Sequence, residues 1–368
     1  MSSRIPAVAS GFALRGDRSE MQKLHNCVWL PGASCSCGFS MKSGFLRHAR
    51  FSQERIVLAI TVALFLLFSV TLNRFLTSAN LLSLLQSVSV LGILGVGMAI
   101  VVIGRGIDLS IVATMAIPVA WVLFMMNQGV STPIAFILWV GLSLAIGILN
   151  GVFIAYVEVP ALFATLAMGT FIYGFGRSRL FNQDIIALPK SEYWIAELGR
   201  MHVGQIPIAV LFFAAICGAG FLLLRYAKIG RFFYLMGENY LAARITGIPT
   251  RPMIVLQYAL SSLVAFVAGT VTMAEVTTIN TRVVNSTLIY DVILVVVVGG
   301  IGLSGGKGGI RNVIVGTLLI GILLNGMTIL DIRYTLQNLI KSFILLAAIL
   351  VDSVVNPRDE QTGQQGDI

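Results

Sequence analysis

Several polar residues of this 368-residue chain stand inside or beside long apolar runs. The string Gly104-Arg-Gly-Ile-Asp-Leu-Ser110 places a carboxylate, Asp108, and a hydroxyl, Ser110, where an apolar run begins. Its glycines let the backbone turn at this point. Both side chains can cap the helix that follows, which is the commoner role for Asp and Ser at such a position. In a membrane protein they can also belong to a polar path.

Uncharged amide and hydroxyl groups lie within the apolar runs themselves. Asn150 either forms an interhelical hydrogen bond or lines a polar path, and packing is favoured because buried amides usually pair with neighbouring helices. Gly147 and Gly151, four residues apart, predict a close helix contact nearby. Such neutral groups suit a hydroxylated solute, although most can instead bond to local helix backbone; they are Asn150, Thr165, Thr170, Thr272 and Asn325.

The glycine-rich string 298–309 contains Lys307 and invites comparison with a nucleotide-binding loop. A Walker A loop needs Gly, four residues, then Gly-Lys followed by Ser or Thr. Here Ile301 stands six residues before Lys307, and Gly308 follows it. Because apolar runs flank the string, it predicts a tight or re-entrant turn. The sequence therefore supplies no ATPase motif.

Catalytic and metal-ligating patterns are missing from the sequence. The three histidines are scattered, and no Ser/His/Asp set or carboxylate pair accompanies them; they are His25, His48 and His202. The four cysteines lack the second ligand pair of a zinc site. We therefore expect no catalytic residues, no cofactor and no metal site.

Ion coupling would need an ionisable residue deep within an apolar run. Of the candidates, only Asp291 and Lys341 stand away from the ends of such runs; the others are Glu275, Asp331 and Asp352. No carboxylate is clearly central, so a proton relay is a weak hypothesis.

Composition identifies an integral membrane protein. Hydrophobic residues make up 57% of the chain and charged residues only 11%, whereas about a quarter of a soluble domain is charged. The net charge of +9 is spread over loops and termini without interleaved aromatic residues, so we expect no nucleic-acid partner. Basic loops on the cytoplasmic side of a membrane explain the excess better.

Ten apolar segments predict an all-α, polytopic transmembrane helical bundle of about ten spans. A span needs about 20 mostly apolar residues, and the fifth segment is short enough to be tilted or re-entrant. A cytoplasmic N-terminus puts most of the 25 Lys and Arg inside, so both termini are predicted to be cytoplasmic. The segments are 55–72, 81–103, 109–126, 133–155, 161–176, 206–224, 253–273, 288–301, 313–330 and 336–354.

Three regions follow from this pattern. Residues 1–50 contain no apolar stretch able to span a bilayer or form a signal sequence, so we expect a disordered cytoplasmic tail. Met41 is an alternative start, because it leads directly into the first span. Residues 51–355 form the predicted membrane domain, and 356–368 a second cytoplasmic tail.

A polar island at 235–249 separates two apolar runs and predicts a short helix. Asn239 is a candidate N-cap, with Glu238 near the end where the helix dipole favours negative charge. Arg244 lies near the opposite end, and Gly247 followed by Pro249 stops the helix. Because the surrounding loop is basic, the helix is predicted on the cytoplasmic face. It is either a docking element or an ordinary amphipathic loop helix.

Four strings resemble the monosaccharide permeases of bacterial ABC importers, the ribose and xylose type, which are related to branched-chain amino acid permeases. The resemblance covers roughly Phe51 to Asp352 and rests on Gly237–Ile248, Gly106–Ser110, Leu149–Pro160 followed by Ala164–Leu166, and the Gly-Gly-x-x-Leu-Ser-Gly-Gly element at 299–306. After Ser110 the chain reads Ile-Val-Ala, where the family usually has Val-Gly-Ser.

The resemblance implies partners, residue roles and a location in the bacterial inner membrane. It implies a homo- or heterodimer of permeases in membrane lipid, an ABC ATPase subunit bound to each, and a periplasmic binding protein that delivers a sugar. Glu158 would help to seat the ATPase. The coupling helix would comprise Gly237, Glu238, Asn239, Ala242, Ala243, Arg244 and Gly247. A translocation or structural motif would comprise Asp108, Ser110, Asn150, Thr165 and Asn325.

Three alternatives stay open at this point. A branched-chain amino acid-type permease would carry groups suited to a zwitterion. An ion-coupled secondary transporter would need a mid-membrane ion site or an inverted repeat. A membrane-embedded enzyme would need a cluster of His or acidic residues near one face.

Overall fold

The computed structural model describes residues 53–355, which are mostly helical. Each of the ten predicted apolar segments corresponds to one helix, with ends shifted by a few residues. The predicted tails and the alternative start at Met41 lie outside the described residues. The ten helices are α2 (Gln53–Thr71), α3 (Ser78–Ile103), α4 (Ile111–Asn127), α5 (Thr132–Ala155), α6 (Ala161–Phe175), α8 (Ile208–Tyr226), α11 (Thr250–Val276), α12 (Leu288–Val298), α13 (Ile310–Ile329) and α14 (Tyr334–Val355).

Six of the described helices are long and apolar enough to cross a membrane: α2, α3, α5, α8, α11 and α13. Shorter apolar helices are α4, α12 and the apolar part of α14. These findings confirm a multi-pass, all-α membrane protein. The count of about ten crossings and the cytoplasmic location of both termini stay predictions.

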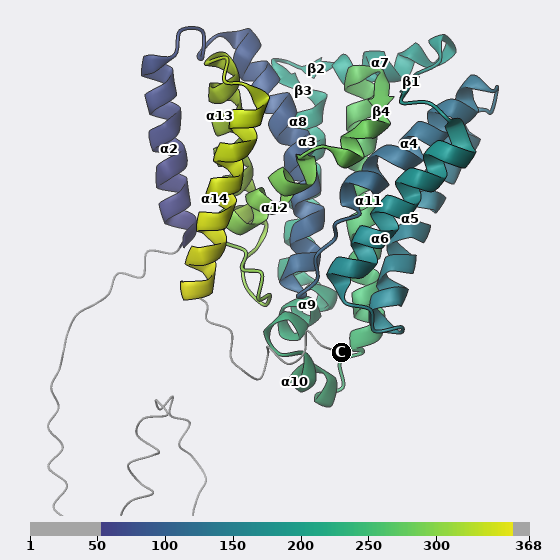
Figure 1. Ribbon diagram of the computed structural model, residues 1–368, viewed down its shortest axis with the longest axis vertical. Coiled ribbons are helices and arrows are strands. Elements are labelled where there is room, and N and C mark those ends of the chain that lie inside the picture. The colour runs from purple at the N-terminus through teal and green to yellow at the C-terminus, as the bar shows by residue number, and fades with distance from the viewer. Residues whose placement is uncertain (1–52, 356–368) are drawn as a thin grey trace, which may run out of the picture. The chain divides into compact units, whose positions relative to one another are not determined.

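The connections between helices gather at two opposite ends of the bundle (Figure 1). One end, called the strand end here, carries two small antiparallel sheets: β1 (Ile185–Ala187) pairs with β4 (Thr278–Asn280), and β2 (His202–Val203) with β3 (Ile206–Pro207). It also carries α7 (Tyr193–Arg200) and three short helical turns, η1 (Gly176–Phe181), η2 (Lys190–Glu192) and η3 (Thr281–Asn285).

The other end, called the α10 end here, carries α9 (Lys228–Glu238) and α10 (Tyr240–Ile245) (Figure 1). α2 begins and α14 finishes at this end (Figure 1). The nearly charge-balanced loop 177–205 and the basic loop 225–252 therefore lie at opposite ends of the bundle, which is the arrangement that the charge pattern predicts.

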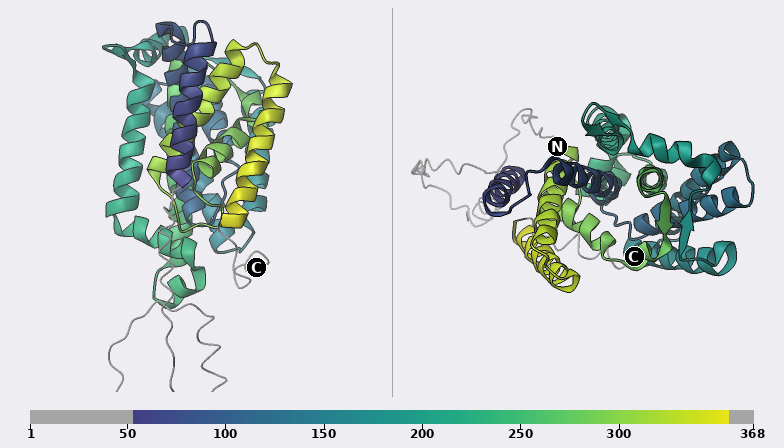
Figure 2. Two further views of the ribbon diagram at one scale, coloured as in Figure 1. Left: turned by 90° about the vertical axis from the view of Figure 1, so that its left-hand side faces the viewer. Right: turned by 90° about the horizontal axis from the view of Figure 1, so that it is seen from above.

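The helices divide into two sides around α3 and α11. Seen from above, α2, α13 and α14 lie on one side and α4, α5 and α6 on the other (Figure 2). α3 runs through the interior, and all its residues from Leu91 to Ile103 are buried. An apolar helix without a polar face suits this position, because protein surrounds it on all sides.

The predicted close contact at Gly147 and Gly151 is confirmed, and its partner is α11. A Cβ atom added at Gly151 would lie 2.5 Å from the Cα of Val255. One added at Gly147 would lie 2.5 Å from the carbonyl oxygen of Tyr258. The two glycines therefore let the backbones of α5 and α11 approach closely.

Three of the ten apolar helices are too short to cross the hydrocarbon core alone. α4 has 17 residues, α6 has 15 and α12 has 11, hence lengths of about 25 Å, 22 Å and 16 Å against a core of about 30 Å. The non-helical segments 104–110 and 299–309 adjoin α4 and α12. Irregular backbone at membrane depth is tolerated only where protein encloses it or water reaches it, so both segments need polar partners inside the bundle.

Candidate functional site

Asp108 lies at the centre of a buried hydrogen-bond network that holds the 104–110 segment. Its Oδ1 accepts hydrogen bonds from the Ser110 backbone N–H at 3.0 Å and the Ser110 hydroxyl at 2.6 Å. Its Oδ2 accepts one from the Ser261 hydroxyl of α11 at 2.8 Å. Only 2% of Asp108 is exposed. Three donors thus compensate the carboxylate for its loss of water.

The network continues into α5 and α6. The Asn150 amide donates to the Ser110 hydroxyl at 2.8 Å, and the Leu109 N–H donates to the Thr165 hydroxyl at 3.1 Å. The Ser110 hydroxyl therefore accepts from Asn150 while it donates to Asp108. The structure brings together four of the five predicted motif residues, Asp108, Ser110, Asn150 and Thr165, in an enclosed arrangement that favours bracing over direct solute contact.

The sequence prediction omits the α11 side of this network. Ser261 bonds to Asp108, the Tyr258 hydroxyl donates to the Ile107 carbonyl at 3.4 Å, and the Gln257 amide donates to the Ile100 carbonyl at 3.3 Å. The signal was available, because Gln257 and Ser261 are four residues apart in an apolar run and so share a helix face.

The glycines of this segment have a different role from the one predicted. Positive φ falls on Arg105, at 72°, and not on Gly104 or Gly106. A Cβ added at Gly104 would lie 1.8 Å from the Gln257 amide nitrogen, and one at Gly106 would lie 2.5 Å from the Tyr258 hydroxyl. Both glycines therefore provide space for α11 side chains.

Asn325 lies apart from the Asp108 network. It forms a reciprocal pair with Asn80 of α3, in which each amide nitrogen donates to the other's oxygen, at 3.0 and 2.9 Å. This pair joins α3 to α13 and satisfies both amides within the bundle. Its geometry is that of a helix contact.

The predicted caps of the short helix α10 are confirmed. The Asn239 side chain accepts a hydrogen bond from the Ala242 N–H at 2.9 Å. At the other end the Gly247 N–H donates to the Arg244 carbonyl and the Ile248 N–H to the Ala243 carbonyl, with φ of +85° at Gly247. This is a Schellman motif, which stops the helix.

Glu238 does not belong to this helix, contrary to the prediction. It is the last residue of α9, since the chain turns at Asn239 before α10 starts at Tyr240. α10 exposes two large apolar residues four positions apart, Leu241 at 53% and Ile245 at 86%. Sequence reasoning missed this exposed pair, because a helix of six residues shows little periodicity.

α9 packs tightly on the glycine-rich segment 299–309. A Cβ added at Gly237 would lie 1.9 Å from the Ile103 carbonyl oxygen and 2.4 Å from the Gly306 nitrogen. The Tyr234 hydroxyl donates to the Gly308 carbonyl at 2.8 Å. Burial raises the pKa of this hydroxyl. Gly237 is therefore a packing residue between α9, α3 and the segment.

Three further contacts connect the parts of the α10 end. The Gly306 N–H donates to the Ile103 carbonyl at 2.8 Å, and the Arg105 Nε donates to the Ser304 carbonyl at 3.0 Å. Glu158 accepts from Arg251 at 2.7 Å, joining the α5–α6 connection to the start of α11. A cavity of about 370 Å³ opens between these parts and α10.

Known proteins resemble the chain over most of its length. The family described as "Branched-chain amino acid transport system / permease component" matches residues 80–351. The ribose import permease protein RbsC of Escherichia coli (strain K12) is 29% identical over 313 residues, covering 84% of this chain and 96% of that protein. RbsC of Bacillus subtilis (strain 168) is 31% identical over 289 residues, covering 78% and 89%.

A relative named for another sugar gives a similar match. The xylose transport system permease protein XylH of Haemophilus influenzae is 27% identical, covering 82% of this chain and 96% of that protein. No solved structure matches the chain significantly. The resemblance drawn from the sequence strings is confirmed. The family match covers most of the chain, including the Asp108 network, α9 and α10. The chain therefore belongs to the branched-chain amino acid transport system / permease component family.

Proposed function

We propose that the chain is the permease subunit of a bacterial ABC importer for a monosaccharide, polyol or similar small neutral solute. The observation that carries the proposal is the near full-length similarity to ribose and xylose permeases. These relatives favour a sugar over the branched-chain amino acid alternative. A partner ATPase supplies the energy, since the sequence has no Walker A loop of its own.

Within this proposal, α10 is the coupling helix and docks in a groove of the ATPase. Exposed apolar side chains at i and i+4, Leu241 and Ile245, fit the helix-in-groove mode of recognition. Asn239 and the Schellman motif fix both ends of the helix, so it enters the groove preformed. Glu238, Ala242 and Arg244 are exposed beside the apolar pair.

The contacts of α9 supply a route from the ATPase to the spans. Closure of two ATPase subunits would push α10, and α9 would pass the displacement to Ile103 of α3 and to the 299–309 segment. The Asp108 network ties the 104–110 segment to α5, α6 and α11, so these helices would tilt together. Alternation between outward-open and inward-open states would follow.

The other partners follow from the same proposal. The α10 end faces the cytoplasm and the strand end faces the periplasm, where a solute-binding protein docks. A second permease, identical or homologous, completes the pathway in the inner membrane. The charge pattern supports this orientation, because the basic loop 225–252 lies at the α10 end.

Complex formation tests the proposal. The chain is purified in detergent with the ATPase and binding protein encoded beside its gene, and ATP hydrolysis is measured with and without loaded binding protein. We expect a stable complex whose hydrolysis rises when loaded binding protein is added. A monodisperse chain that binds neither protein would contradict the proposal.

A further inference from the structure

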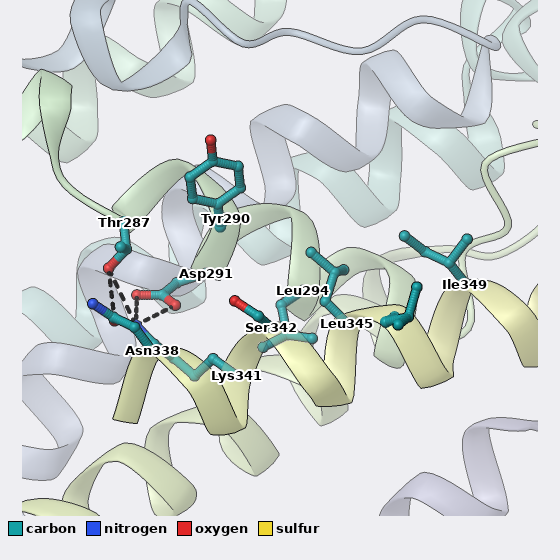
Figure 3. Close-up of a pocket in the computed structure, with 10 residues that line it drawn as sticks. Thr287, Tyr290, Asp291, Leu294, Asn338, Lys341, Ser342, Leu345 and Ile349 are labelled. Carbon is teal, nitrogen blue, oxygen red and sulfur yellow. Dashed lines mark hydrogen bonds and ion pairs between the residues drawn. The ribbon is translucent and has the colours of Figure 1, made fainter. Parts of the chain in front are cut away.

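A buried ion pair joins α12 to α14, away from the Asp108 network. The Lys341 Nζ lies 2.8 Å from Oδ1 and 3.0 Å from Oδ2 of Asp291 (Figure 3). Only 7% of Asp291 and 6% of Lys341 are exposed. Ionisable residues within membrane-spanning segments are costly and mark solute or ion pathways by default. A use beyond packing is therefore expected of this pair.

Neutral hydrogen-bonding groups surround the ion pair. The Lys341 ammonium also donates to the Thr287 hydroxyl at 3.3 Å, and that hydroxyl lies 3.3 Å from Asn338 Oδ1, to which it donates. Within about one turn of each helix, the chain thus gathers a carboxylate, an ammonium, an amide and a hydroxyl. Figure 3 shows these four side chains converging at one end of a pocket.

The pocket beside the pair is large enough for a small molecule. Its volume is about 300 Å³, at the lower limit of the range of about 300–1,000 Å³ for small-molecule sites. Leu345 and Ile349 of α14 form its apolar part, while Tyr290 and Ser342 border it (Figure 3). Tyr290 is 58% exposed. Polar groups within membrane-spanning segments face water or protein in preference to acyl chains.

This lining matches the chemistry of a sugar. A monosaccharide presents hydroxyls that both donate and accept, together with apolar C–H faces. The Asp291 oxygens accept, the nitrogens of Lys341 and Asn338 donate, and the Tyr290 ring offers a stacking surface. The paired charges cancel, so the pocket has no net charge with which to attract an ion.

We propose that the pocket at Asp291 and Lys341 is a contact site for a polyhydroxylated neutral solute as it crosses the membrane. The proposal rests on the proposed function. If the Asp291–Lys341 ion pair only stabilised the packing of α12 on α14, lipid would fill the pocket and water-soluble reagents would not reach it. Water access and protection by sugar therefore separate the two roles.

Cysteine modification tests water access. The full chain, with its native cysteines replaced, receives Ser342→Cys and is reconstituted in liposomes. A cationic methanethiosulfonate reagent is applied, and the rate of modification is measured by mass spectrometry. The matched control is Phe343→Cys, the adjacent residue, which is 71% exposed and does not line the pocket.

Ser342→Cys is expected to react about tenfold faster than Phe343→Cys, because the reagent needs water. D-ribose, D-xylose or D-galactose at high concentration should slow the reaction at position 342 alone, and leucine should not. Equal rates at the two positions, or no protection by any of the three sugars, would overturn the proposal. The experiment needs neither ATPase nor binding protein, so its failure is distinct from failure of the complex to form.

Discussion

The Asp108 carboxylate has three hydrogen-bond donors and, within residues 53–355, forms no ion pair. Asp108→Ala leaves the Ser110 N–H and the hydroxyls of Ser110 and Ser261 without this acceptor. Each buried polar group that loses its hydrogen-bond partner lowers the free energy of unfolding by about 1–3 kcal/mol. We expect a clear fall in the thermal unfolding midpoint of the purified protein, measured by intrinsic fluorescence.

Asp108→Asn is the matched control for that substitution. Its oxygen still accepts from Ser110, and the Ser261 hydroxyl rotates to accept from the new amide. It should therefore retain most of the stability that Asp108→Ala loses. Equal midpoints for wild type and both variants would contradict the bracing role of Asp108.

A substitution at Gly151 tests the close contact between α5 and α11, because it adds a side chain at the point where the two backbones meet. Gly151→Leu places atoms 2.5 Å from the Val255 Cα, and overpacking costs about 1–3 kcal/mol. We expect a lower yield of monodisperse protein by size-exclusion chromatography. Gly141→Leu is the control, because Gly141 is also in α5 and has open space around its Cβ position. Indistinguishable profiles for the two variants would refute the close contact.

At the scale of elements, α10 is held by its own caps and presents its apolar pair outward. Leu241→Asp with Ile245→Asp should leave the fold unchanged, because both side chains are exposed, but should prevent ATPase binding. Glu238→Arg with Arg244→Glu should weaken binding through the charges beside the pair. Both effects are measured by co-purification of the ATPase. Normal assembly with the ATPase in both double variants would contradict the assignment of α10 as the coupling helix.

Hydrophobic length and local caps were sufficient to predict most elements. All ten apolar helices, the Asn239 cap and the Gly247 stop follow from residues near in sequence. The contacts of Ser261 and Asn80 do not, because they join helices far apart in the chain. Glu238 was assigned to the wrong helix, since α9 and α10 meet at a single residue with no glycine or proline between them.

The candidate site was predicted in part for the same reason. Polar residues in apolar runs identified Asp108, Ser110, Asn150 and Thr165, and the structure joins them through hydrogen bonds. Asn325 met the same criterion but pairs with α3, since composition cannot tell which helix a buried amide will face. The sequence identifies Asp291 and Lys341 as ionisable residues within apolar runs, but their pairing depends on how α12 packs on α14.

At the scale of the whole molecule, force must pass from α10 into the spans through α9. Gly237→Ala would place a methyl group against the Ile103 carbonyl and push α9 away. We expect ATPase binding to persist, because α10 is unchanged, while stimulated hydrolysis falls about tenfold or more, equivalent to about 1.4 kcal/mol of coupling. Gly218→Ala, with open space around it in α8, is the control. Full stimulation in Gly237→Ala would contradict this route.

Solute uptake by the reconstituted protein tests the importer function most directly. The chain, its ATPase and its binding protein are placed in proteoliposomes with the binding protein and radiolabelled sugar on one side and ATP on the other. Uptake that requires all three proteins and hydrolysable ATP is the expected result. Uptake by the chain alone, driven by an ion gradient and unaffected by the α10 substitutions, would contradict the ABC importer function and indicate a secondary transporter.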